Sequence, residues 1–230
     1  MTEIPAYASE LIARYQRLKL GSTNSTDKTV IANSIFQTQK IEGDVIELGC
    51  GTGRTATYTA QLLSLLNSSK QYYCYDTFEG FPDIVTDYDR YGVDGKPVQN
   101  LHKLKKGHLK NPFAKFRDNF IKYASGCPFP IVVKKAFSDL TPEDLPQKIS
   151  FAFFDGDLYQ SIIDSFKVTT PKLSVGGLIY VHDNRAERVL SWCGVRKACD
   201  EMISSLNCFE VIDLNPFPVY KKIREIEKST

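Results

Sequence analysis

The segment from Val45 to Thr55, Val-Ile-Glu-Leu-Gly-Cys-Gly-Thr-Gly-Arg-Thr, narrows the choice of fold more than any other part of this chain. An apolar strand carries the acid Glu47 at its end. Glycines follow at three alternate positions: Gly49, Gly51 and Gly53. Glycine lacks a Cβ and tolerates positive φ, so these residues allow a sharp turn with exposed backbone N–H groups. The run from Ala56 to Leu66 predicts a helix whose N-terminus attracts an anionic group, so the segment is suited to holding one end of a charged small molecule.

The spacing of these glycines disfavours a dinucleotide site. The dinucleotide fingerprint is Gly-x-Gly-x-x-Gly, and counting from Gly49 its third glycine would fall at position 54, which is Arg54. A tight strand-to-helix turn without any ligand is the alternative. The glycine turn alone does not distinguish a ligand site from a plain turn, so the acidic residues after the later strands are the evidence that does.

Length and composition predict a single α/β domain over residues 1–230. Hydrophobic residues at 42% and charged residues at 24% are ordinary for a globular protein, and no apolar run is long enough to span a membrane. Six cysteines without a Cys-x-x-Cys pair, and an N-terminus without a secretory signal, predict reduced thiols in a cytoplasmic protein. The net charge of +2 predicts no general attraction to nucleic acid.

From residue 43 onward, strand-like and helix-like segments alternate. The expected strands cover residues 44–48, 71–75, 131–135, 149–154 and 177–182. The expected helices cover residues 55–66, 159–169 and 194–205. This alternation implies right-handed crossovers and a parallel sheet with helices on both faces. Segments 209–214 and 217–222 flank an Asn-Pro turn and predict an antiparallel pair at the sheet edge.

Two parts of the chain depart from this alternation. Residues 1–40 contain an amphipathic stretch at 6–18, a polar stretch at 21–28 and a helical candidate at 29–39, which together predict a helical appendage or lid. Residues 81–128 are rich in Pro, Gly, Asp, Tyr and Lys, and they predict a functional insertion with a helix near 112–123.

Polar residues at the ends of the strands are the candidate site residues, because ligands bind beyond the carboxyl ends of an open α/β sheet. The second strand ends in Asp76, and an acid there can accept hydrogen bonds from both hydroxyls of a ribose. An ordinary turn or cap is the alternative for Asp76. After the third strand, Phe137 offers an apolar surface for a purine and Ser138 a hydrogen-bonding group, although Ser-Asp also begins turns.

The fourth and fifth strands end in a cluster of ionisable residues. Asp155 and Asp157 directly follow one strand, and His182 and Asp183 follow the next. Carboxylates that lie close together repel, and a divalent cation, a raised pKa or full hydration relieves the repulsion. The alternatives are a helix N-cap for Asp157 and a hydrogen-bonded structural histidine for His182.

Five motifs together resemble the macrocin O-methyltransferase (TylF-like) family over about residues 41–202. They are Glu-Gly-Asp-Val-Ile-Glu-Leu-Gly, Tyr-Asp-Thr-Phe-Glu-Gly-Phe-Pro, Phe-Asp-Gly-Asp-Leu-Tyr-Gln-Ser, Leu-Ser-Val-Gly-Gly and Gly-Val-Arg-Lys-Ala-Cys-Asp-Glu. The resemblance implies a Rossmann-like class I methyltransferase fold: a mostly parallel seven-stranded sheet with helices on both faces and an antiparallel C-terminal edge strand. It also implies S-adenosylmethionine as methyl donor and, in many members, a magnesium ion beside the acceptor hydroxyl.

The resemblance assigns roles to the candidate residues. Glu47 and the glycines would face the methionine end of the cofactor, Asp76 the ribose and Ser138 the adenine. The full set of expected cofactor contacts is Glu47, Gly49, Gly51, Gly53, Arg54, Thr55, Asp76, Thr77, Phe78, Phe137, Ser138 and Asp155.

The same resemblance places Asp155 as a metal ligand and Asp157 as a general base. The family's paired aspartates at the next strand end fall on His182 and Asp183, so His182 departs from the pattern. Magnesium prefers oxygen ligands, whereas an imidazole suits manganese, iron or another transition metal. A metal held by Asp155, His182 and Asp183 is therefore an open expectation. Such a cation would lower the pKa of the acceptor hydroxyl. Without it, Asp157 or His182 would remove the proton as general base.

The expected function is an O-methyltransferase for a sugar or another small hydroxylated metabolite. The alternative is a cofactor-binding protein without methyltransferase activity, in which His182 reflects a lost metal site. We expect the appendage and the insertion to set acceptor specificity, with no nucleic acid or membrane partner and, by analogy, a homo-oligomer. A basic run in the insertion could neutralise an acidic acceptor or form a solvated helix face: Lys103, Lys105, Lys106, Lys110, Lys115 and Arg117.

Overall fold

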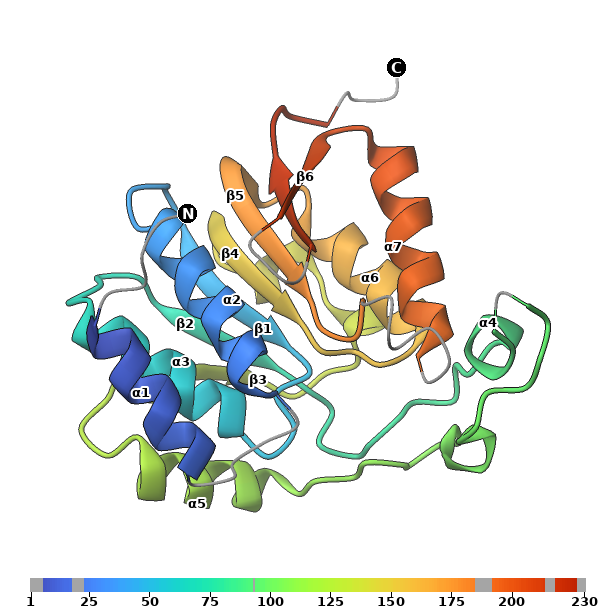
Figure 1. Ribbon diagram of the computed structural model, residues 1–230, viewed down its shortest axis with the longest axis horizontal. Coiled ribbons are helices and arrows are strands. Elements are labelled where there is room, and N and C mark those ends of the chain that lie inside the picture. The colour runs from blue at the N-terminus through green and yellow to red at the C-terminus, as the bar shows by residue number, and fades with distance from the viewer. Residues whose placement is uncertain (1–5, 18–22, 93, 185–191, 214–217, 227–230) are drawn as a thin grey trace.

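A computed structural model of the chain describes residues 6–17, 23–92, 94–184, 192–213 and 218–226. In this part of the chain, strands form one seven-stranded sheet in the order β3-β2-β1-β4-β5-β7-β6 (Figure 1). The strands are β1 (Asp44–Leu48), β2 (Tyr72–Tyr75), β3 (Ile131–Val133), β4 (Ile149–Phe154), β5 (Leu173–Val181), β6 (Phe209–Asp213) and β7 (Pro218–Lys222). The first five are parallel, as the alternation of elements predicts.

The C-terminal strand β7 runs antiparallel to both of its neighbours and lies between β5 and the edge strand β6. The pair expected at the sheet edge is therefore present, with β6 outermost. At the end of β7, the buried Lys222 donates from Nζ to the carbonyl oxygens of Leu173 at 2.7 Å and Thr170 at 3.2 Å. These bonds fasten β7 to the start of β5.

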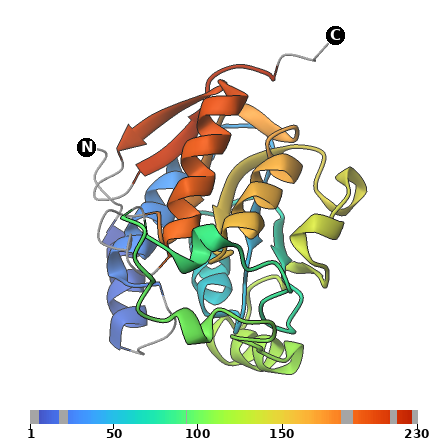
Figure 2. The ribbon, with the colours of Figure 1, turned by 90° about the vertical axis from the view of Figure 1, so that its right-hand side faces the viewer.

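Helices cover both faces of the sheet, as Figures 1 and 2 show. One face carries α1 (Ala6–Arg17), α2 (Ser25–Gln37), α3 (Arg54–Leu65) and α5 (Phe113–Tyr123). The other carries α6 (Tyr159–Thr169) and α7 (Cys193–Leu206), whose buried Ile162, Phe166, Val195 and Cys199 pack against the sheet. Such a stripe of apolar residues at helical spacing is what turns one side of each helix toward the core.

The N-terminal appendage packs on the sheet through α2, and α1 packs on α2 and α3. Tyr15 of α1 meets Tyr58 of α3 edge to face, with ring centroids 5.5 Å apart. Helix α2 begins at Ser25, so the expected polar stretch ending at residue 28 was wrong over its last four residues. A capping box explains this start: the Asn24 side chain accepts from the N–H of Asp27 at 3.0 Å, and the Asp27 carboxylate accepts from the N–H of Asn24 at 2.8 Å.

Two strands differ from their expected bounds by two residues or more, and β2 begins one residue late, at Tyr72. β3 stops at Val133, two residues before its expected end. β5 begins at Leu173 rather than at 177, because Leu173 pairs with Ile149 before a shift in register along β4. Two consecutive glycines, Gly176 and Gly177, lie inside β5. Such a pair weakens a strand and is more typical of a turn.

The segment between β2 and β3 contains the short helix α4 (Asp87–Arg90), a 3-10 turn at Leu101–Lys103 and α5, close to the helix expected near 112–123. All six cysteines are free thiols. Within the described residues, no helix combines the length and apolarity needed to cross a bilayer.

Candidate functional site

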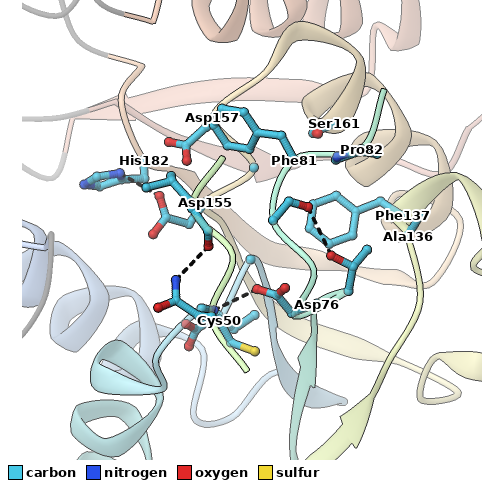
Figure 3. A pocket seen from close by; sticks show the side chains of 18 of the residues that line it. Cys50, Asp76, Phe81, Pro82, Ala136, Phe137, Asp155, Asp157, Ser161 and His182 are labelled. Carbon is cyan, nitrogen blue, oxygen red and sulfur yellow. Dashed lines mark hydrogen bonds and ion pairs between the residues drawn. The ribbon is translucent and has the colours of Figure 1, made fainter. Parts of the chain in front are cut away.

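A cavity of about 440 Å³ lies beyond the carboxyl ends of β1, β2, β4 and β5. The strand order reverses there, because the chain leaves β1 for β2 on one side while β4 pairs with β1 on the other. That reversal point is where open α/β sheets bind ligands. Figure 3 shows Asp76 and Phe137 on one side of the cavity, and Asp157 and His182 on the other.

The three glycines of the turn differ in their surroundings. Gly49 has a φ of +96°, and a Cβ there would lie 2.2 Å from the carbonyl oxygen of Asp155, so only glycine fits between β1 and β4. Gly51 lines the cavity with open space around its missing Cβ. Gly53 lies outside the lining, contrary to expectation, because its missing Cβ makes room for the ring of Phe116 in α5. Gly49 and Gly51 therefore both line the cavity, and Gly49 and Gly53 are also constrained by packing.

Glu47 is a buried carboxylate at the cavity wall. It accepts a hydrogen bond from the hydroxyl of Tyr72, and no basic side chain pairs with it among the described residues. Burial raises the pKa of Glu47 from 4.5 to about 8, and nearby Asp155 and Asp76 add to the effect. A cationic group in the cavity would favour the charged carboxylate.

Asp76 bridges the glycine turn and the end of β2. Its Oδ2 accepts from the N–H of Gly51 at 2.8 Å, and its Oδ1 accepts from the N–H of Phe78 at 2.7 Å. Burial raises the pKa of Asp76. An ionised carboxylate has about four acceptor sites, so both oxygens keep capacity for hydroxyl donors.

Phe78 does not line the cavity, contrary to expectation. Its φ of +60° turns the ring into the core, where it packs edge to face on Phe113 and Phe116 with centroids 5.2 and 5.7 Å away. Its neighbour Thr77 does line the cavity and donates its hydroxyl to the carbonyl oxygen of Gly80 at 3.2 Å. Only the backbone of Phe78 therefore serves the site.

The remaining expected contacts lie at the cavity wall. Phe137 and Ser138 line it together with Ala136. Arg54 and Thr55 begin α3, and both line it. Among the described residues the buried Nε of Arg54 has no hydrogen-bond partner. An orphaned N–H at a helix N-terminus fits an anionic ligand group.

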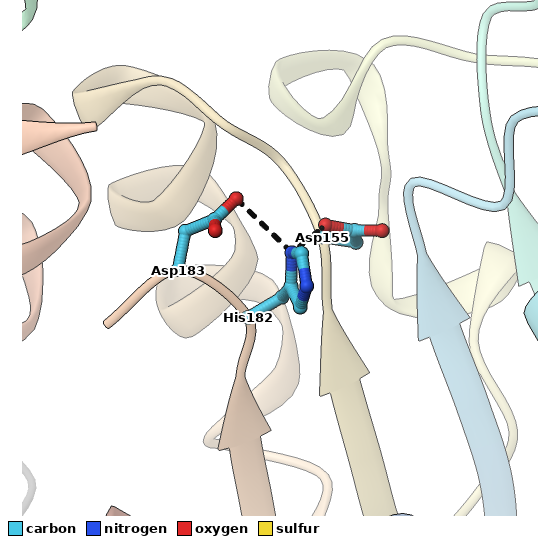
Figure 4. A group of neighbouring side chains, drawn as sticks. All are labelled: Asp155, His182 and Asp183. Carbon is cyan, nitrogen blue, oxygen red and sulfur yellow. Dashed lines mark ion pairs between the residues drawn. The ribbon is translucent and has the colours of Figure 1, made fainter. Parts of the chain in front are cut away.

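Two aspartates, Asp155 and Asp183, lie against one histidine, His182, as Figure 4 shows. The Nδ1 of His182 lies 2.7 Å from Oδ1 of Asp155 and 3.0 Å from Oδ2 of Asp183. One ligand atom from each of the three residues lies within 4.8 Å of the others. A set of one imidazole nitrogen and two carboxylate oxygens at this spacing fits a divalent ion, and the nitrogen favours a transition metal over magnesium.

The pKa values in this cluster follow from crowding. Burial opposes the charged form of His182, but Asp155, Asp183 and Asp27 outweigh it and raise its pKa well above the usual range. Burial also raises the pKa of Asp157, and repulsion from Asp155 and Asp183 adds to the shift. The carboxylates around His182 therefore favour the charged form of its ring, and its role as a general base stays a prediction.

Sequence reasoning missed Asp27. It lies in α2, is fully buried, and places Oδ2 at 3.6 Å from Nε2 of His182. In the sequence Asp27 shows only a capping pattern with Asn24, which carries no hint of a distant histidine. The individual side chains that wall the cavity on the insertion side were also missed: Phe81, Ile84, Leu109, Asn111 and Trp192.

Comparisons with known proteins agree with the expected family. The chain is 27% identical over 157 residues to the 8-demethyl-8-(2,3-dimethoxy-alpha-L-rhamnosyl)-tetracenomycin-C 4'-O-methyltransferase of Streptomyces olivaceus, covering 68% of this chain and 56% of that protein. It is 27% identical over 144 residues to the demethyldecarbamoylnovobiocin O-methyltransferase of Streptomyces niveus, covering 62% and 53%. The chain thus spans about half the length of the curated relatives it matches.

The structure of the O-methyltransferase NovP is similar in fold, with a TM-score of 0.73 at 18% identity, covering 95% of this chain and 98% of that one. The expected class I methyltransferase fold is confirmed. Residues 20–207 match the family described as macrocin-O-methyltransferase (TylF). Because that match covers most of its length, the chain belongs to the macrocin O-methyltransferase (TylF) family.

Proposed function

We propose that this chain is an S-adenosylmethionine-dependent O-methyltransferase that acts on a hydroxyl of a sugar or another small metabolite. The observation that carries the proposal is one continuous cavity in which Glu47, the glycine turn and Asp76 lie opposite Asp157 and the His182 cluster. The first group suits an amino-acid end and a ribose, and the second suits a hydroxyl that must lose its proton.

The methyl donor, when bound, supplies a methyl group on a positively charged sulfur. Glu47 would hold its ammonium group, because that buried carboxylate lacks a cation among the described residues. Arg54 at the start of α3 would hold its carboxylate. Asp76 would accept from the ribose hydroxyls, and Phe137 would cover the adenine. Holding donor and acceptor in line supplies much of the rate, since the entropy of alignment is lost on binding.

Asp157 is the group we assign to remove the acceptor proton. It lines the cavity, it forms a hydrogen bond with Asp183, and its raised pKa makes it a stronger base than an ordinary aspartate once ionised. His182 is less suited, since its Nδ1 already faces two carboxylates.

A metal fits this site as an additional component. Asp155, His182 and Asp183 would hold it, and it would lower the pKa of an acceptor hydroxyl. Because one donor is an imidazole, we propose manganese, iron or another transition metal ahead of magnesium.

The acceptor side of the cavity is apolar. Phe81 and Trp192 meet edge to face with centroids 6.2 Å apart, and Ile84 and Leu109 extend the wall. We propose an acceptor with an apolar part next to its reactive hydroxyl, such as a glycosylated aromatic compound or a deoxysugar. The relatives named above methylate a rhamnosyl tetracenomycin and a novobiocin compound, which agrees with this proposal. A cytoplasmic location and a homo-oligomeric state stay predictions.

The test combines calorimetry and turnover. Calorimetry with S-adenosylmethionine should show binding, and a panel of glycosides and nucleotide-linked sugars should reveal methyl transfer by mass spectrometry. Asp157→Asn should lower kcat by about 10²–10⁴-fold without changing cofactor affinity. Asp118→Asn, at an exposed acid paired with Arg117, is the matched control and should leave kcat unchanged. No cofactor binding would overturn the proposal, and binding without turnover across the panel would favour the non-catalytic alternative.

A further inference from the structure

We propose that Asp27 is a positioning residue that fixes the orientation of the His182 imidazole from the N-terminal helical segment. The proposal concerns the site of the proposed function, and the part of its test that measures kcat rests on that function. Asp27 itself does not line the cavity. Its Oδ2 lies 3.6 Å from Nε2 of His182, which does line the cavity.

Asp27 is itself held rigidly. Its Oδ2 accepts from the backbone N–H of Asn24 at 2.8 Å, and its Oδ1 accepts from the hydroxyl of Tyr180 at 2.6 Å. Tyr180 and His182 are two residues apart at the end of β5, so both side chains point to the same face of the sheet. That face is the one against which α2 packs. The carboxylate is thus clamped between the helix and the strand that leads into His182.

The two nitrogens of His182 face different neighbours. Nδ1 faces Asp155 and Asp183, which belong to the site, and Nε2 faces Asp27, which does not. At 3.6 Å the Asp27 carboxylate attracts the Nε2 side of the ring as a charge, beyond ordinary hydrogen-bond distance, and it favours the orientation in which Nδ1 faces Asp155 and Asp183. Carboxylates placed behind a histidine in this way set its ring orientation.

Helix capping alone does not account for this placement. Asp144 caps a short turn in the same way, through a box with Thr141, and it lies at the surface against Lys135. A capping acid therefore needs no burial. Asp27 differs because it is fully buried and because its two oxygens also serve Tyr180 and His182.

A double-mutant cycle tests the proposal. Asp27→Asn should lower kcat by about 10–100-fold and leave the affinity for S-adenosylmethionine unchanged. In the His182→Asn background the same change should have no further effect, because Asp27 acts only through that ring. Asn24→Ala is the matched control: it removes the side-chain half of the capping box but keeps the backbone N–H that binds Asp27, so it should lower Tm and leave kcat unchanged. Equal losses of kcat in both backgrounds, or a loss in Asn24→Ala equal to that in Asp27→Asn, would overturn the proposal.

A second readout is independent of turnover. The chain has three histidines, so ¹⁵N-histidine labelling gives few side-chain signals, and the His182→Asn variant identifies those of His182. Asp27→Asn should shift the Nε2 signal and speed the exchange of its proton. Tyr180→Phe, which removes the hydroxyl that holds Asp27, should produce a smaller change in the same signal. Unchanged His182 signals would overturn the positioning role, whereas failure to find any acceptor would count only against the proposed function.

Discussion

Replacing Gly49 by alanine should damage the fold far more than the same change at Gly51. At Gly49 the added Cβ would lie 2.2 Å from the carbonyl oxygen of Asp155, about 1.2 Å inside an ordinary contact of 3.4 Å. Both atoms belong to backbone at the ends of paired strands, where the N–H of Asp155 donates to Leu48 at 2.8 Å and the N–H of Gly49 donates to Tyr75 at 2.8 Å. The clash can be relieved only by separating β1 from β4.

The cost follows from two contributions. A side chain at a φ of +96° is strained by about 1–3 kcal/mol, and weakening one buried backbone hydrogen bond costs about 1–3 kcal/mol more. We expect Gly49→Ala to lose about 2–6 kcal/mol in the free energy of unfolding, or about 4–24 °C in Tm for a chain of this size. Gly51 has a φ of +46°, and a Cβ added there would meet no atom within 4 Å, so Gly51→Ala should cost only about 1 kcal/mol.

Thermal and urea denaturation of the two variants beside the parent protein measure the difference. Calorimetry adds a second check, because Gly49→Ala should also weaken S-adenosylmethionine binding by displacing Asp155. Equal losses of stability in the two alanine variants would refute the reasoning. The chemical change is the same at both positions, and the contacts of the added Cβ differ.

Three further predictions concern the cavity. Glu47, with its pKa raised from 4.5 to about 8, keeps a proton in the folded protein that the unfolded chain loses, so its contribution makes the fold less stable as pH rises from about 4.5 to 8. Glu47→Gln should flatten that slope in denaturation curves measured across pH, and identical slopes would contradict the assignment. Asp155→Asn should abolish any ion-dependent share of activity, measured with and without a chelator, and unchanged activity and metal content would rule out its role as a ligand. Trp192→Ala should raise the acceptor KM about tenfold or more while the cofactor affinity stays constant. A change in cofactor affinity with an unchanged acceptor KM would contradict the assignment of Trp192 to the acceptor side of the cavity.

The sequence predicts those elements whose apolar runs are bounded by turn residues. β1, β4 and α6 begin and end at the expected residues, because glycine, aspartate or proline lies close to their ends. The approach of Asp155 to His182 and Asp183 was also predictable, since the carboxyl ends of neighbouring parallel strands meet at one edge.

Other features depend on contacts that local sequence does not record. Gly53 leaves room for the ring of Phe116, and Phe78 turns into the core because its φ is +60°. Asp27 and Tyr180 are bonded across 153 residues of sequence, so the carboxylate that faces His182 could not be found from motifs near the site. Local patterns predict strands, turns and helices. That Asp27 lies beside His182 depends instead on how helix α2 packs on the sheet.

The place of β7 in the sheet has a consequence for how the protein is made. β7 pairs with β5 through residues 178–180, so a growing chain from which β7 has not yet emerged carries a β5 edge with unpaired N–H and C=O groups. Domains fold as the ribosome delivers them, and here β5 gains its antiparallel partner only after β7 has emerged. A ribosome that stalls before Pro218 would therefore hold a chain whose β5 edge is unpaired, and such edges favour edge-to-edge association between chains.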